Sequence, residues 1–238
     1  MAMQKTETYI DVMTDLETTD TEPNAAIAAI GATVFDRQSG QLGNRFYVSI
    51  DISTSVADGG VISAETFKWR MAQTSTARQS FAGTAHIHSA LHQFGNWLQL
   101  QRTTPDSEIR IWGNGPDFDM VVLSQSYKRA GMVLPWKFWN VRCFRTLKAE
   151  YPSIPMERSG THHNALDDAI TQAKHVLRID AELAKTIEPE GAVAARPIPG
   201  ELVTIEADHD MRRLGFIMCI AIALGVISTI ANLAHYIF

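Results

Sequence analysis

The first fifty residues constrain the fold of this chain more than any other segment. YIDVMTDLE, AAIAAIGATVFD and RFYVSI are apolar runs of strand length, separated by polar or Gly-containing turns. Three sequential antiparallel strands are therefore expected. Beyond about residue 63 the apolar spacing becomes helical, and a short strand at RIWGNG precedes helices at about 118–130 and from about residue 165. This order predicts an α/β fold with a mixed sheet flanked by helices.

The C-terminal end of the chain is uncharged over a length that suits a membrane span. No residue from Leu214 to Phe238 is charged, and this run of about 25 residues exceeds the roughly 20 that cross a bilayer as a helix. Arg212 and Arg213 precede it, which under the positive-inside rule leaves the rest of the chain in the cytoplasm. A single-pass C-terminal transmembrane helix is expected, with a buried helix of the soluble fold as the alternative.

A change in composition separates this run from the globular part. The segment 186–211 contains EPEGAVAARPIPGE, which is rich in Pro and Gly and lacks periodicity, as linkers do. Three parts are thus expected: a globular domain at 1–185, a linker at 186–211 and a membrane anchor at 212–238. The four-residue spacing of Ala221, Gly225 and Thr229 favours helix pairing, and with it a homo-oligomer.

Net charge sets a condition on any nucleic-acid partner. The chain carries 21 Lys and Arg against 26 Asp and Glu, a formal net charge of −5, so it has no overall basic field. A nucleic acid would have to be bound by a local basic patch or through bound metal. Two cysteines, Cys143 and Cys219, are too few for a disulfide framework.

Two acidic residues stand two positions apart at the end of the first expected strand. Side chains at i and i+2 of a strand point to the same face, so Asp15 and Glu17 would present two carboxylates together. Carboxylate oxygens are the ligands that divalent cations such as Mg²⁺ prefer. Alone, such a pair is more often an acidic turn at a strand end.

A third acid, Asp119, follows the Gly113-Asn114-Gly115 turn and opens a helix. It would project just beyond a strand end, where open α/β sheets tend to bind ligands. The structural alternative is that it complements the helix dipole, although Asp117 is the better candidate for that role as the N-cap.

The third polar cluster, HHNALDDA, lies where a loop meets the helix from about residue 165. A histidine beside a metal-binding carboxylate is suited to take a proton from water. Asn164 can cap the helix, and Asp167 at the N3 position can reach back as in a capping box. That structural role for Asp167 leaves Asp168 as the candidate ligand.

Taken in order, TDLET, NGPDFDMVVL and HHNALDDA resemble the three exonuclease motifs of the DEDDh branch of the RNase H-like superfamily, which includes RNase T and polymerase proofreading subunits. Phage and bacterial exonuclease VIII-like and DexA-like proteins are the most similar group. WGNGPDFD and PWKFWNVRCFRT, at Trp112–Asp119 and Pro135–Thr146, carry that similarity. The resemblance covers roughly residues 8–185, and three ordered motifs are more specific than any one of them.

The resemblance implies a five-stranded mixed sheet and a 3′–5′ exonuclease at 1–185. It assigns His163 as the general base and four acids as ligands of two Mg²⁺ or Mn²⁺ ions: Asp15, Glu17, Asp119 and Asp168. Two such ions stabilise the attacking and leaving oxygens of a phosphodiester, and cleavage at 3′ ends would release nucleoside 5′-monophosphates. DNA is the favoured polymer and RNA the alternative. A membrane-tethered nucleic-acid-binding module without catalysis is the alternative from a different class.

A basic and aromatic segment, 127–148, has six Lys and Arg residues and no acid. Cations on phosphates and aromatic rings under bases bind single strands without sequence preference. Four residues represent this candidate nucleic-acid surface: Lys137, Trp139, Arg142 and Arg145. The structural alternative, to which we give equal weight, is that the aromatic residues belong to the core and the cations to a solvated rim.

Overall fold

The first three strands form the antiparallel half of the sheet. The computed structural model describes residues 8–186, and its first strands are β1 (Tyr9–Thr18), β2 (Ile27–Asp36) and β3 (Gln41–Ser49). β1 pairs antiparallel with β2, and β2 pairs antiparallel with β3. The prediction of three sequential antiparallel strands is confirmed.

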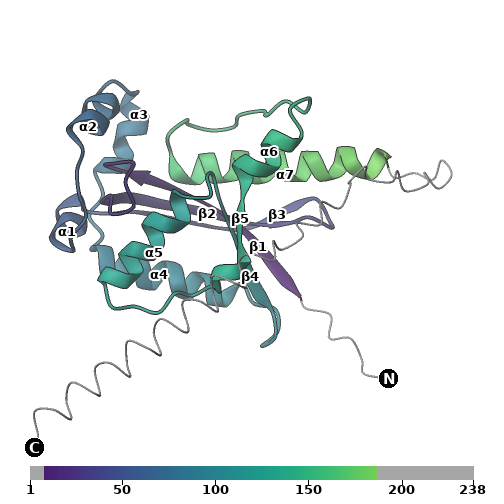
Figure 1. Cartoon of the computed structure of the whole chain (residues 1–238), viewed down its shortest axis with the longest axis horizontal. Helices are drawn as coiled ribbons and strands as arrows, with labels where there is room; N and C mark the ends of the chain where they lie inside the picture. The colour runs from purple at the N-terminus through teal and green to yellow at the C-terminus, as the bar shows by residue number, and fades with distance from the viewer. Residues whose placement is uncertain (1–7, 187–238) are drawn as a thin grey trace, which may run out of the picture. The chain divides into compact units, whose positions relative to one another are not determined.

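Two parallel strands complete the sheet on the other side of β1. β4 (Glu108–Gly113) pairs parallel with β1, and β5 (Val141–Cys143) pairs parallel with β4. The order across the sheet is β3-β2-β1-β4-β5 (Figure 1). The predicted mixed five-stranded sheet is therefore confirmed, and β1 lies at its centre.

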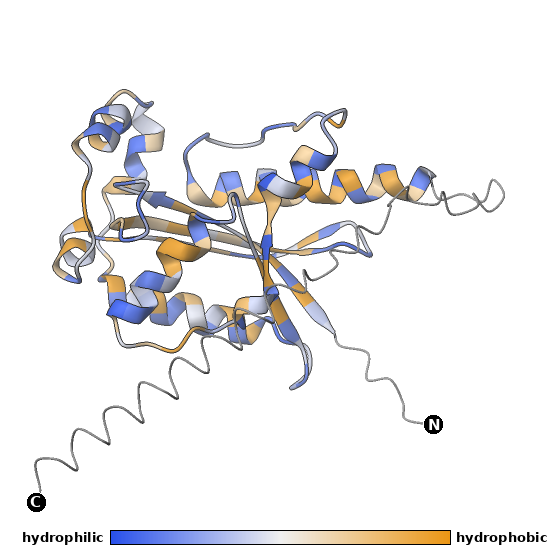
Figure 2. Ribbon diagram, in the orientation of Figure 1, coloured by the Kyte–Doolittle hydropathy of each residue, from blue (hydrophilic) through white to orange (hydrophobic). Residues whose placement is uncertain are grey.

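One face of the sheet is covered by α4 (Ile87–Leu100) and α5 (Asp119–Arg129). Apolar residues spaced by four and three positions place one stripe of α4 against the sheet. The stripe consists of Ile87, Leu91, Phe94 and Leu98, all fully buried. The same cluster contains Leu16 from β1 and Leu123 from α5. Figure 2 shows apolar and polar residues alternating along α4.

The opposite face is covered by α6 (Phe144–Glu150) and α7 (Ala165–Thr186), as Figure 1 shows. Met13 of β1, Phe144 of α6 and Ala173 of α7 belong to the core on this side. Gly31 of β2 permits the close approach of α7, because a Cβ at this position would lie 2.2 Å from the backbone carbon of Ala165. Gly31 pairs with Asp15 across the sheet, so the first turn of α7 is brought beside an acidic residue of β1.

Short helices connect these elements. They are α1 (Ile52–Ala57), α2 (Ala64–Met71) and α3 (Ser75–Arg78), with 3₁₀ turns at η1 (Gln79–Phe81) and η2 (Phe138–Asn140). Each α-helix among them begins after a side chain that accepts a hydrogen bond from the backbone of its first turn. These N-caps are Asp51, Ser63 and Thr74. The capped α2 presents Trp69 and Arg70 to the site described below.

The start of α5 differs from the sequence prediction. The N-cap is Phe118, which makes no side-chain capping bond, so the assignment of Asp117 as N-cap was wrong. Asp119, the first residue of α5, instead accepts a hydrogen bond from the backbone N–H of Asn114 in the turn that follows β4.

Parts of the predicted chain organisation lie outside the described residues. The linker segment beyond residue 186, the anchor at 212–238 and its helix-pairing spacing are among these. Within residues 8–186, no helix combines the length and apolar character needed to cross a bilayer.

Candidate active site

Asp15 and Glu17 lie on the face of β1 that α7 covers. Leu16, between them, points to the other face and is buried in the core formed with α4 and α5. Met13 shares the face of Asp15 and belongs to the core formed with α6 and α7. This alternation is that of a regular strand, and the prediction that both carboxylates share one face is confirmed.

Asp119 is the first residue of α5 and is only 2% exposed. Its Oδ2 accepts a hydrogen bond from the backbone N–H of Asn114 at 2.6 Å. Gly113 leaves room for this side chain, because a Cβ there would lie 3.0 Å from the Cβ of Asp119. The glycine turn after β4 therefore holds the third carboxylate in place.

The N-terminus of α7 is held by two side chains, Asn164 and Asp167. Asn164 Oδ1 accepts hydrogen bonds from the backbone N–H groups of Leu166 and Asp167, both at 3.2 Å, which confirms its role as cap. Asp167 also has a structural role, but its Oδ2 accepts from the backbone N–H of Thr161 at 2.7 Å. The predicted capping-box contact from Asp167 back to the Asn164 amide was wrong, because that amide donates to the Thr161 carbonyl.

Asp168 follows on the inner side of α7. Its Oδ2 accepts a hydrogen bond from the backbone N–H of His163 at 2.9 Å, and its Oδ1 accepts one from Arg158 at 2.9 Å. The first contact ties the histidine loop to the helix that carries the carboxylate. Asp168 and His163 therefore occupy fixed positions relative to each other.

These segments, far apart in the sequence, meet in one pocket of about 250 Å³. Ligand oxygens of Asp15, Glu17 and Asp168 lie within 4.8 Å of one another. Asp119 and His163 line the same pocket. The structure thus brings together the five residues that the motifs singled out.

The four carboxylates of the pocket repel one another. Burial, and then repulsion from the neighbouring acids, raises the pKa of Asp15 well above its usual range. Burial is also the main cause that raises the pKa of Glu17 to about 7 and that of Asp119 to about 6. Divalent cations would relieve this repulsion, and clustered carboxylate oxygens are the donors that Mg²⁺ and Mn²⁺ take. The donor set therefore fits hard divalent cations.

His163 has a backbone conformation that few residues adopt. Its φ of 63° lies in the left-handed region. Its ring stacks on His162, with ring centroids 3.7 Å apart, and meets the Trp69 ring edge-on at 4.8 Å. Burial, and then the charges of His162 and Arg70, lowers the pKa of His163. A lowered pKa keeps the imidazole neutral near pH 7, the form that accepts a proton.

Three further residues contact the acids and were missed by the sequence analysis. Gln172 Nε2 donates to Asp15 Oδ1 at 2.8 Å. Gln172 lies four residues after Asp168 on α7, a spacing that places both side chains on one helix face. This spacing could have identified Gln172 from the sequence. Arg70 of α2 forms an ion pair with Glu17 and is itself 9% exposed. No sequence pattern around Arg70 or Arg158 indicates that either residue contacts the acids.

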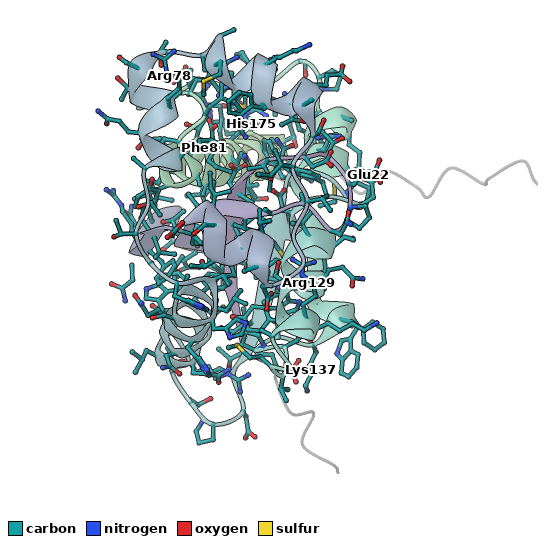
Figure 3. All side chains as sticks on the ribbon, turned by 90° about the vertical axis from the view of Figure 1, so that its left-hand side faces the viewer. Glu22, Arg78, Phe81, Arg129, Lys137 and His175 are labelled. Carbon is teal, nitrogen blue, oxygen red and sulfur yellow. The ribbon has the colours of Figure 1, made fainter. Side chains whose placement is uncertain are left out.

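The predicted nucleic-acid surface divides into separate regions. Arg145 lines the acidic pocket and donates to the Asn114 carbonyl at 2.7 Å. Lys137 pairs with Glu108 and lines a different pocket; Figure 3 shows it in the lower part of the molecule, well below His175 of α7. Trp139 is 57% exposed, and Arg142 donates to its carbonyl at 2.9 Å.

The core alternative for this segment holds for three of its aromatic residues. Tyr127, Trp136 and Phe144 are 2%, 5% and 1% exposed. Phe138, at 76% exposed, joins Trp139 on the surface, where the two rings meet edge-on. Of the four residues chosen to represent the surface, only Arg145 lines the pocket of the clustered carboxylates.

Carboxylates from β1, α5 and α7 thus meet in one pocket with a histidine of lowered pKa, a donor set that suits divalent cations. Residues 10–179 match the family model described as the 3′–5′ exoribonuclease Rv2179c-like domain, and the chain belongs to this family. It is therefore a 3′–5′ exonuclease, and the non-catalytic alternative is not supported. No curated protein sequence matches the chain significantly.

Solved structures share the fold at low sequence identity. The nuclease domain of 3′hExo, a DEDDh family member bound to rAMP, has a TM-score of 0.53 and 12% identity over 73% of this chain and 92% of that chain. Exonuclease I in the apo form gives 0.51 and 14%, over 75% and 45%. Pop2p of S. pombe, with Mg²⁺ and Mn²⁺ bound, gives 0.50 and 12%, over 75% and 86%. The RNase H-like exonuclease fold expected from the motifs is confirmed.

Proposed function

We propose that the chain removes nucleoside 5′-monophosphates from the 3′ end of RNA, using two divalent cations, Mg²⁺ or Mn²⁺. Four residues would hold the cations: Asp15, Glu17, Asp119 and Asp168. His163 would be the general base. The observation that carries this proposal is the convergence of the four acids, from β1, α5 and α7, with a histidine held by one of them.

The chemistry divides between the cations and the chain. When bound, the cations stabilise the negative charge that develops on the attacking and leaving oxygens of the phosphodiester. The neutral His163 imidazole accepts a proton from the attacking water. Gln172 fixes the orientation of Asp15 through its amide. Arg70 and Arg158 offer guanidinium groups at the pocket wall, where they would bind phosphate oxygens.

A larger recess next to the acids supports RNA as the substrate. It measures about 650 Å³ and shares Arg70 and Phe118 with the acidic pocket, and volumes of about 300–1,000 Å³ suit ligands the size of a nucleoside. Its wall includes Trp69, 45% exposed, and Glu65. An aromatic ring can stack on a base, and a carboxylate can accept a hydrogen bond from a ribose hydroxyl. The sequence analysis favoured DNA; the family description names exoribonucleases, so DNA becomes the second candidate.

Matched RNA and DNA oligonucleotides with a 5′ label test the substrate. In Mg²⁺ we expect a ladder that shortens from the 3′ end, with kcat/KM for RNA at least about tenfold higher, the size of one lost hydrogen bond to a 2′-hydroxyl. EDTA should abolish cleavage of both. Faster cleavage of DNA would reverse the substrate assignment, and cleavage that persists in EDTA would contradict the role of the cations.

The uncharged run at the C-terminus supports a second proposal, a membrane location. We propose that residues 212–238 anchor the enzyme, with the catalytic domain in the cytoplasm. The full-length chain should remain in the membrane pellet after alkaline extraction. Leu224→Arg places a charge near the centre of the run at a cost of about 2.5–3.5 kcal/mol and should shift protein to the supernatant. Complete recovery of the unaltered chain in the supernatant would contradict the anchor.

A further inference from the structure

A small pocket adjoins the active site across Arg158. It measures about 120 Å³, and Arg158 lines both this pocket and the acidic one. The other lining residues are Glu157, Ser159, Lys174, His175 and Arg178. Ligands of drug size need about 300–1,000 Å³. This pocket therefore suits a single small group rather than a whole nucleotide.

The charge of the small pocket is positive. Its lining includes one acid, Glu157, and three cations: Arg158, Lys174 and Arg178. Glu157 pairs with Arg178, but its side chain is 75% exposed, so solvent screens that pair strongly. Lys148, which lines the acidic pocket, adds a further positive charge near His175. Basic side chains collected in this way favour an anion.

His175 is the buried member of the pocket, at 2% exposed. Within the part of the chain that the structure describes, neither of its ring nitrogens has a hydrogen-bond partner. Buried polar atoms in proteins are nearly always paired. The Phe144 ring meets it edge-on, with centroids 5.8 Å apart, and gives neither nitrogen a partner. A ligand oxygen in the pocket would provide the missing partner.

The remaining polar groups are partly committed to the loop before α7. Arg178 donates to the Pro155 carbonyl at 2.8 Å, so it holds the loop as well as lining the pocket. Lys174 is exposed, and its contact to Ser159 Oγ is long, at 3.3 Å. Lys174 is thus the cation that can turn to a ligand with the least disturbance of the fold.

From these observations we propose that the small pocket binds one phosphate group of the nucleic-acid strand, at a position other than the diester that is cut. This proposal rests on the proposed function, since the strand must enter the neighbouring acidic pocket. Phosphate fits because it is anionic, compact and able to accept hydrogen bonds from both lysine and imidazole. A free phosphate or mononucleotide has the same chemistry, and the experiment separates the two sources.

The kinetic experiment compares two RNA substrates with the full-length enzyme. A dinucleotide with a free 5′-hydroxyl has only the diester that is cut. A ten-nucleotide strand has further phosphates that can occupy the small pocket. Lys174→Ala should lower kcat/KM on the longer strand about tenfold, the size of one charge-assisted hydrogen bond, and leave the dinucleotide unchanged. Lys174→Arg should restore the rate. Lys185→Ala, on the same helix and paired with Glu182, is the control and should change neither.

The binding experiment follows the ring resonances of His175 by NMR. Inorganic phosphate is added in EDTA, where the uncompensated carboxylates repel anions from the acidic pocket. We expect a saturable shift that is lost in Lys174→Glu. A shift without the length-dependent loss would overturn the strand assignment in favour of a free anion. Absence of both the shift and the length-dependent loss would contradict any anion binding in the small pocket.

Failure of the proposed function gives a different pattern. An enzyme that cleaves no oligonucleotide would refute the nuclease assignment and, with it, the strand as the source of the phosphate. The His175 titration would still decide whether the pocket binds an anion. A loss of equal size on the dinucleotide and on the longer strand would instead show that Lys174 acts within the catalytic pocket, contrary to the proposal.

Discussion

Replacement of Asp15 by Asn is expected to lower hydrolysis of an RNA oligonucleotide in Mg²⁺ by at least about 10³-fold. The change keeps the size of the side chain and an oxygen that can still accept from Gln172, whose amide contacts Asp15 at 2.8 Å. It removes one negative charge from the set that would hold the cations. Metal ions supply several kcal/mol of transition-state stabilisation, and about 1.4 kcal/mol corresponds to tenfold in rate.

The same substitution should affect stability in the opposite direction. The pKa of Asp15 in the folded state is raised by burial and by the neighbouring acids, so the folded state binds a proton that the unfolded state has released. The free energy of unfolding therefore falls as pH rises above the unfolded-state pKa of about 3.9. In EDTA at pH 8, Asp15→Asn should unfold at a higher temperature than the wild type, because it lacks that repulsion.

Two measurements separate this outcome from simple misfolding. Mg²⁺ should raise the melting temperature of the wild type, since a ligand that binds only the folded state stabilises it, and should have a much smaller effect on Asp15→Asn. Asp167→Asn is the matched control: it makes the same chemical change at an acid of α7 whose carboxylate accepts from the backbone of Thr161, and its activity should stay within a few-fold. A loss of activity accompanied by a lower melting temperature in EDTA would argue for a folding defect.

The parts of the site that local sequence rules govern could be predicted. Alternation along β1 placed Asp15 and Glu17 on one face, and Asn164 caps α7 as its position before an apolar period indicated. Both features depend on residues within a few positions of one another. Their convergence with Asp119 could be anticipated only through the order of the motifs, because no local rule brings β1, α5 and α7 together.

The parts that depend on tertiary contacts could not be predicted. Arg70 reaches Glu17 from α2, and short helices in a long connection give no signal for where they pack. At Gly31 the backbone of Ala165 leaves no space for a side chain, and no local sequence rule brings residue 165 to this strand. The basic and aromatic segment was treated as one surface, but η2 and β5 lie between Lys137 and Arg145, and the chain turns them to different pockets.

His163→Asn is the second substitution with a large expected effect, a loss of about 10²–10⁴-fold in kcat, the usual contribution of a general base. Asn is chosen because His163 has a φ of 63°, and Asn is among the residues that adopt left-handed backbone most readily. The backbone N–H that donates to Asp168 is retained. His162→Asn is the matched control, since its ring stacks on His163 from the exposed side, and it should lose less than about tenfold.

The pH profile gives the sharper test of His163. A general base must be neutral to accept a proton, so kcat of the wild type should rise with pH and level off once the imidazole has lost its proton. Because burial lowers the pKa of His163, the midpoint should fall below the ordinary value of about 6.5. Mg²⁺ must be saturating at each pH, since protonation of the carboxylates also weakens metal binding. The residual activity of His163→Asn should lack this rise; if it keeps the wild-type profile, or if His162→Asn loses more activity, another group takes the proton.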